Sequence, residues 1–159
     1  MAVNKATLAA NFAANTPNDP RLHQSRGRVV KQSVAIAAGD NDGDVFLVAP
    51  VHSSWCIDSI AVLNDAITGG TDYDVGLYEI VETVVDADAY ASGVDMSSAR
   101  TAPLDVAFEA RDIAKVQNAV WQDAGLTADP QKWFYLALTA NTAGTAAGDI
   151  SVILRYTSD

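Results

Sequence analysis

The sequence Trp133-Phe134-Tyr135-Leu136-Ala137-Leu138-Thr139 places large apolar residues at every second position. The same alternation returns in Asp149-Ile150-Ser151-Val152-Ile153-Leu154-Arg155-Tyr156. Successive side chains of a strand point to opposite faces of the sheet, so this spacing predicts two strands that each bury one face. The segment between them holds Asn141, Gly144 and Gly148, which favour turns. We therefore predict a hairpin, and its apolar face requires further strands to cover it.

Upstream segments supply those strands. The alternating pattern predicts strands at residues 29–36, 45–49, 55–63, 73–81 and 104–108. The first two flank a turn-rich segment, residues 39–44, and are expected to pair as a hairpin. In the third, the apolar positions shift by one residue near Asp58-Ser59, which predicts a bulge. Residues 84–101 are rich in small residues and read as a long irregular loop.

One segment has helical periodicity. Apolar residues fall on one helix face in the set Ile113, Val116, Val120, Trp121 and Ala124. Asp112 can cap the start of this helix and Gly125 can follow its end, which predicts an amphipathic helix at about residues 111–125. The predicted fold is all-β: an antiparallel β-sandwich or jelly-roll-like domain at residues 28–159, with that one helix. Residues 1–27 lack sustained periodicity and are predicted to form an extended N-terminal arm.

Charge is distributed unevenly along the chain. The net charge is −10, yet residues 1–31 hold five basic residues and one acidic residue, which gives +4, and the remainder carries −14. The acidic body disfavours nucleic acid as a partner, because phosphates are bound by Lys and Arg. The basic leading segment suits docking on an acidic surface, either another copy of the body or another protein. A solvated chain end is the other interpretation.

No recognised catalytic or metal-binding motif is present. His23 and His52 are the only histidines, and neither lies in a nucleophile, phosphate-loop or zinc-protease pattern. The acidic turn from Asp40 to Asp44 has its glycine at the wrong position for an EF-hand, so a solvated turn is favoured over a Ca²⁺ site. The single cysteine, Cys56, is expected to be buried in a strand. We predict no enzyme activity, no cofactor, no metal, no secretory signal and no membrane segment.

The second face of the 133–139 strand is also aromatic. Trp133 and Tyr135 alternate with Phe134 and Leu136, so both faces of this strand should be covered. The predicted helix and a partner subunit are the two candidates for the cover. Exposed aromatic side chains would alternatively suit a carbohydrate- or host-receptor-binding module.

Several segments together resemble a known family of virion proteins. They are residues 73–78 (Tyr-Asp-Val-Gly-Leu-Tyr), 85–95, the run 119–126 before Asp129-Pro130, and the ending from 135 to 156. In these segments the chain resembles head decoration or capsid-cement proteins of tailed bacteriophages, over about residues 30–157. The resemblance implies a β-sandwich or jelly-roll-like protein that binds the outside of an assembled head, commonly as a trimer that bridges neighbouring capsomers.

The resulting hypothesis is a non-enzymatic structural virion protein that binds and stabilises the outside of a phage capsid as a homo-oligomer. Its partners would be the major capsid protein and other copies of itself, with neither nucleic acid nor membrane involved. It would be made in the host cytoplasm and reside on the capsid surface. The candidate partner-binding residues are Arg21, Arg26, Arg28, Lys31, Trp133 and Tyr135.

Overall fold

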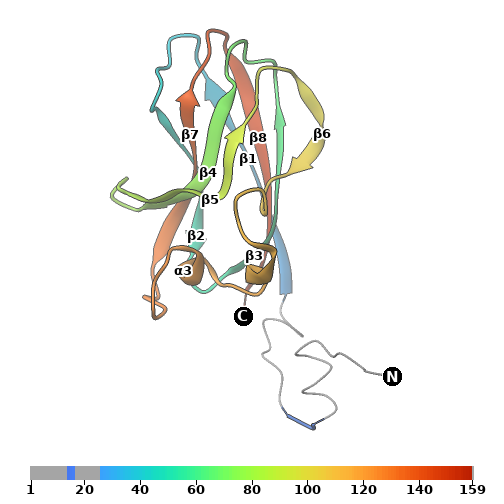
Figure 1. Cartoon of the computed structure of the whole chain (residues 1–159), viewed down its shortest axis with the longest axis vertical. Coiled ribbons are helices and arrows are strands. Elements are labelled where there is room, and N and C mark those ends of the chain that lie inside the picture. The colour runs from blue at the N-terminus through green and yellow to red at the C-terminus, as the bar shows by residue number, and fades with distance from the viewer. Residues whose placement is uncertain (1–13, 17–25, 159) are drawn as a thin grey trace.

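Two four-stranded antiparallel sheets face each other in the computed structural model, which describes residues 14–16 and 26–158. The strands are β1 (Arg26–Ile36), β2 (Val45–His52), β3 (Cys56–Asn64), β4 (Asp72–Glu79), β5 (Val84–Val94), β6 (Arg100–Asp105), β7 (Trp133–Thr142) and β8 (Gly148–Ser158). One sheet, here the β8 sheet, has the order β1-β8-β3-β6, and the other, the β7 sheet, has the order β2-β7-β4-β5 (Figure 1). This interleaved order is that of a jelly roll. The predicted fold class is confirmed.

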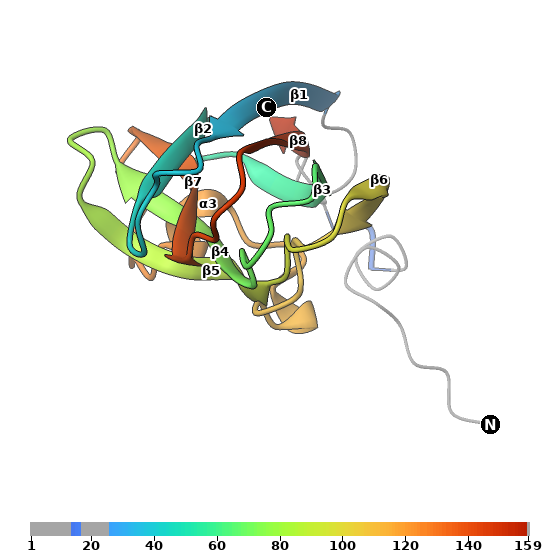
Figure 2. The ribbon, with the colours of Figure 1, turned by 90° about the horizontal axis from the view of Figure 1, so that it is seen from above.

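The core lies between the two sheets, which Figure 2 shows edge-on. The alternating side chains predicted to face inward are buried, among them Phe134, Leu136 and Leu138 of β7 and Ile150 and Leu154 of β8. Because each strand contributes every second residue, the two sheets bury their facing sides in one continuous cluster. Burial of apolar area at about 25 cal/mol per Å² is the main stabilising contribution in such a sandwich.

Both predicted hairpins are wrong in their pairing, although their strands exist. β7 pairs with β2 and β4, whereas β8 pairs with β1 and β3. Residues 143–147 therefore cross from one sheet to the other, and the Thr145 N–H donates to the carbonyl of Thr68 at 2.8 Å. β1 and β2 likewise lie in different sheets. In each case the two apolar faces meet across the core instead of lying side by side.

The predicted bulge in β3 is confirmed. The register between β3 and β8 shifts between Ile57 and Ser59. This shift lets Ile57 and Ile60 both face the core, since an extra residue restores the inward direction after the change of phase. The one-residue shift of the apolar positions thus correctly predicted where β3 bulges.

β5 replaces most of the loop predicted at residues 84–101. Its register against β4 is irregular: Val75 lies opposite Ala91, while Leu77 lies opposite Asp86. The β5 backbone bulges over β4 in this interval. A Cβ at position 76 would lie 2.1 Å from the Asp86 carbonyl oxygen, so only Gly76 permits this close approach.

The helix predicted at about 111–125 is much shorter and is interrupted. The chain forms a 3₁₀ turn, η1 (Ile113–Lys115), and one α-helical turn, α3 (Val120–Asp123). Between them Ala119 is extended and pairs with Cys56, because its neighbour Val120 donates its N–H to the Trp55 carbonyl at 2.8 Å. Ile113 consequently stays 79% exposed. The predicted ends were correct: Asp112 caps η1, and Gly125 follows α3 with a φ of 71°.

Candidate docking surface

Four aromatic rings form a cluster near the last residues of β2 and β8 and the first residue of β7. α3 lies and β1 begins at this end of the sandwich (Figure 1). Trp55 stacks on Tyr156 with ring centroids 3.9 Å apart. Trp133 packs at a steep angle against Trp55, at 5.3 Å, and against His52, at 5.1 Å. Trp133 is nevertheless 45% exposed. The cluster therefore holds one large aromatic side chain at the surface in a fixed orientation.

A buried serine fixes the chain just before Trp133. The Ser53 hydroxyl donates to Asp129 Oδ1 at 2.5 Å and accepts from the Lys132 N–H at 3.1 Å. The Ser53 N–H also donates to the Lys132 carbonyl at 2.9 Å. Ser53 is fully buried, so these bonds satisfy groups that water does not reach. The start of β7 is thereby tied to the loop between β2 and β3.

Among the residues that the structure describes, β1 carries three of the five exposed lysine and arginine side chains. The described residues include eight lysines and arginines: Arg26, Arg28, Lys31, Arg100, Arg111, Lys115, Lys132 and Arg155. Arg111 is buried in an ion pair, and Lys132 is paired with Glu79. Three of the others lie on β1, and Arg155 of β8 lies opposite Val29. A cationic strip thus follows one edge of an otherwise acidic body.

The aromatic cluster and the cationic strip meet at the same end of the fold. Arg28 lies opposite Tyr156 in the β1–β8 register, and its Nε donates to Ser158 Oγ at 3.1 Å. Tyr156 in turn stacks under Trp55, which contacts Trp133. Side chains from both sheets therefore converge there. Such a surface offers a fixed aromatic group beside flexible cations, which suits an acidic protein surface.

The structure separates other predicted partner-binding residues. Lys31 is exposed on the outer face of the β8 sheet, and Tyr135 is half-buried on the β7 sheet opposite Tyr78. Arg21 lies outside the described residues, as does almost all of the predicted arm. Arg26 and Gly27, assigned from sequence to the arm, are the first residues of β1.

The short helix does not cover the outer face around Trp133 and Tyr135. Val120 of α3 is instead buried in the core between the sheets. Sequence reasoning also missed that His52 and Tyr156 belong to the aromatic cluster. Their distance from Trp133 along the chain left no local signal of this contact.

A buried polar network supports this end of the sandwich. The side chains of Arg111 and Asp123 form an ion pair at 3.0 Å, and the Tyr90 hydroxyl donates to Asp123 at 3.2 Å. Burial raises the pKa of Asp123, an effect that the Arg111 guanidinium opposes. Burial and then the Asp123 carboxylate raise the pKa of Tyr90 well above its usual range. These groups have protein partners, so we assign them a structural role.

The acidic turn at residues 40–44 uses its carboxylates to hold the backbone. Asp40 accepts from the Ala37 N–H at 2.7 Å, and Asp42 accepts from the Ala143 N–H at 2.9 Å. Within residues 14–16 and 26–158, no group of three or more His, Cys, Asp and Glu residues is placed to hold a metal ion. Over the same residues, no helix has the length and apolar character needed to cross a membrane.

Comparisons with known proteins find similarity at the level of the fold. No family model and no curated protein matches the chain. A chain from the solved "Cyanophage Pam1 capsid asymmetric unit" superposes with a TM-score of 0.53 and 13% identity, covering 85% of this chain and 86% of that one. A chain from the "Capsid of Ralstonia phage GP4" superposes with a TM-score of 0.58 and 12% identity, covering 84% and 85%. The jelly roll of this protein is therefore similar to the folds of chains found in two phage capsids.

Proposed function

We propose that this protein is a non-enzymatic structural component of a phage virion that binds the outside of the capsid and stabilises it as a homo-oligomer. The observation that carries the proposal is the similarity of the whole jelly roll to chains of two phage capsids, over more than four-fifths of each chain. The partners are the major capsid protein and further copies of this chain, with a trimer as the expected assembly. The protein then resides on the capsid surface.

The docking surface is the end of the sandwich that combines Trp133 with the start of β1. Arg26 and Arg28 are exposed there, and the N-terminal arm continues from the same point. Cations on long side chains accelerate the encounter with an acidic surface, and a fixed indole supplies apolar contact area once the surfaces meet. Each contact is individually weak. Several copies joined in one oligomer bind with avidity across the boundary between capsomers, which opposes separation of the shell.

Co-sedimentation with heads assembled without this protein tests the proposal. The variant R26E/R28E reverses the charge at the docking end, and we expect at least tenfold weaker binding, because like charges then face each other. Deletion of residues 1–25 tests the arm while leaving β1 intact. K115E is the control for charge reversal at the same end of the fold but outside β1, because it reverses one exposed cation on η1 and should weaken binding much less. Failure of the unmodified protein to bind heads in low salt would overturn the proposal.

A glycan-binding module is a second candidate, favoured by Trp133 alone. A half-exposed indole held between His52 and Trp55 resembles the platforms on which sugar rings stack. Glycan-array binding that is lost in W133A, with an unchanged unfolding temperature, would favour this function. Head binding that is lost in W133A would favour the first.

A further inference from the structure

The turn that joins β4 to β5 carries exposed branched aliphatic side chains at its tip. They are Ile80, Val81 and Val84, which are 47%, 80% and 54% exposed. The tip is folded, because the Glu79 N–H donates to the Thr83 carbonyl at 2.8 Å and the Glu82 N–H donates to the Glu79 carbonyl at 2.8 Å. This hairpin projects beyond the rest of the sandwich in both views (Figures 1 and 2). Adjacent apolar side chains on an ordered projection indicate a surface that binds protein.

The same tip is acidic. Glu82 is exposed among the aliphatic side chains, and Asp88 is exposed further along β5. Glu79 is already engaged by Lys132, at 2.8 Å. A surface that fits this tip must therefore combine a shallow apolar depression with positive charge.

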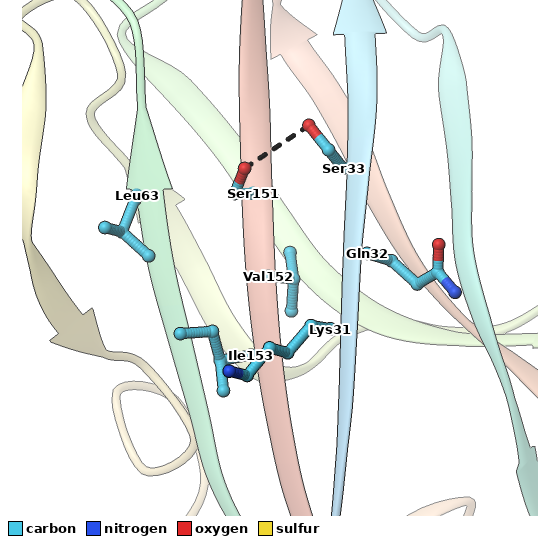
Figure 3. Close-up of a pocket in the computed structure, with 7 residues that line it drawn as sticks. All are labelled: Lys31, Gln32, Ser33, Leu63, Ser151, Val152 and Ile153. Atoms are coloured by element: carbon cyan, nitrogen blue, oxygen red, sulfur yellow. Dashed lines mark hydrogen bonds between the residues drawn. The ribbon is translucent and has the colours of Figure 1, made fainter.

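The outer face of the β8 sheet has this combination. A depression of about 360 Å³ is lined by Leu63 of β3, Ile153 and Ser151 of β8, and Lys31 and Ser33 of β1. Figure 3 shows the Lys31 side chain lying along Ile153, with Leu63 on the other side of the depression. Lys31 is exposed, and Arg155 and Val29 lie one step along the same face. The charge and the apolar character both complement those of the tip.

These two surfaces do not meet within one chain. The β4–β5 tip belongs to the β7 sheet and projects away from the β8 sheet, as the view from above shows (Figure 2). We propose that the tip of one copy docks on the β8-sheet outer face of a second copy, with Val81 between Leu63 and Ile153 and with Glu82 facing Lys31. The contact joins two different surfaces of the same chain. Contacts of that kind are head-to-tail and close into a ring when the rotation between copies allows it.

This inference rests on the proposed homo-oligomer and names the contact that builds it. It also assigns Lys31 to the contact between copies, whereas Arg26 and Arg28 are assigned to docking on the capsid. The occupant is a second copy because the complementary pair of surfaces is present on this one chain. A capsid protein in the depression is an alternative outcome of the test.

Engineered cysteines test the head-to-tail arrangement directly. The native Cys56 is buried, so cysteines introduced at the surface dominate the accessible thiols. We expect a mixture of V81C and S151C chains to form disulfide-linked pairs on oxidation, and each variant alone to remain unlinked. The double variant V81C/S151C should give linked species up to one closed size, which reports the number of copies in the ring. Efficient linking of V81C to itself would overturn the proposal, as would no linking in the mixture.

A charge exchange provides an independent readout by light scattering coupled to size exclusion. K31E and E82K should each weaken self-association about tenfold, and K31E/E82K should recover most of the loss, because the pair is restored with opposite polarity. V81D should also dissociate the oligomer, whereas V116D, at an exposed valine outside both surfaces, should not. A double variant as weak as either single variant, or a wild-type chain that is monomeric at every concentration, would overturn the proposal.

Co-sedimentation separates this contact from the docking end. If V81D is monomeric and a single copy still binds heads weakly, both proposals stand, and the loss of avidity measures the contribution of the ring. If V81D binds heads as strongly as wild type, self-association is not the source of avidity. If V81D stays oligomeric but loses head binding, the tip contacts the capsid protein and the head-to-tail contact is wrong.

Discussion

Arg111 and Asp123 are joined by a hydrogen bond and an ion-pair contact inside the end of the sandwich where α3 lies. Arg111 Nε donates to Asp123 Oδ1 at 3.1 Å, and Nη2 lies 3.0 Å from Oδ2, with side chains 1% and 2% exposed. The guanidinium also donates to the carbonyl oxygens of Ile57 at 3.2 Å and Lys115 at 2.8 Å. One buried cation thus joins β3, η1 and α3. Without regular helix between residues 115 and 120, this network holds the segment in place.

Replacement of Asp123 by asparagine should destabilise the fold strongly. Removing the carboxylate leaves a buried guanidinium without its counter-charge, and breaking such pairs typically costs about 3–5 kcal/mol. Urea unfolding measures the free energy of unfolding of D123N against wild type. The matched control is D112N: Asp112 is exposed and caps η1, and asparagine caps equally well, so we expect a change within about 0.5 kcal/mol. A loss below about 1 kcal/mol in D123N would show that the pair is dispensable.

Alkaline pH should destabilise the fold through Tyr90. Burial raises the pKa of this phenol well above its usual value, with the Asp123 carboxylate adding to the effect. Above about pH 10 the unfolded chain loses this proton while the folded chain retains it, so the free energy of unfolding falls as pH rises. Below that pH, Tyr90 makes no pH-dependent contribution.

The variant Y90F tests this linkage. It should be less stable than wild type at about pH 8, because the hydrogen bond to Asp123 is lost. The gap should then narrow as the pH rises above about 10, since phenylalanine does not ionise. Urea unfolding at several pH values measures both curves. If the free energies of unfolding of Y90F and wild type keep a constant difference up to about pH 11, the pKa of Tyr90 is not raised.

Gly76→Ala should prevent β5 from lying against β4. The added methyl group would lie 2.1 Å from the Asp86 carbonyl oxygen and 2.3 Å from the Ala87 backbone, neither of which can move without breaking the pairing. Overpacking of this kind costs about 1–3 kcal/mol or more. Gly39→Ala is the control, because no atom lies within 4 Å of its added Cβ. Thermal unfolding should show a clearly lower unfolding temperature for G76A and an unchanged one for G39A. Equal unfolding temperatures for the two variants would mean that β5 can lie against β4 without this close approach.

Sequence alternation was sufficient to predict that most strands exist but not which strands pair. Phe134 and Ile150 each show that their strand buries one face, and the turn residues between them fit a hairpin equally well. Pairing depends on contacts far apart in sequence, such as β8 with β1, which local periodicity does not encode. The same lack of long-range information explains why the predicted helix was too long. Ile113 and Val116 fit a helical period, yet the pairing of Ala119 with Cys56 interrupts it.

The candidate site was likewise predictable only in part. The strict alternation of its strand predicted that Trp133 lies on the face opposite Phe134, and Trp133 is 45% exposed while Phe134 is buried. The expected cover by the helix is absent, and cover by a partner subunit stays a prediction. The contact of His52 and Trp55 with Trp133 depends on two strands and a loop meeting in space, so nothing near Trp133 in the sequence indicates it. The sequence did not indicate the exposed β4–β5 tip for another reason. Ile80 and Val81 extend an apolar run that is typical of a buried strand.

Ser53→Ala should reduce head binding through its effect on Trp133. The Ser53 hydroxyl bonds to Asp129 and to the Lys132 N–H, the residue before Trp133 in the chain. Its removal takes the acceptor from the Lys132 N–H and one donor from Asp129, which still accepts from the Gln131 N–H at 2.9 Å. The loss of such hydrogen bonds costs about 0.5–1.5 kcal/mol each and loosens the start of β7. We therefore expect a lower unfolding temperature, altered tryptophan fluorescence and weaker co-sedimentation with heads. The oligomer should persist, because the Ser53 hydroxyl bonds to neither of the two surfaces proposed to join the copies. Ser98→Ala, at an exposed serine outside both surfaces, is the control. If S53A binds heads as well as wild type at a temperature where it is fully folded, the fixed orientation of Trp133 is not needed for docking, and the cations of β1 alone account for it.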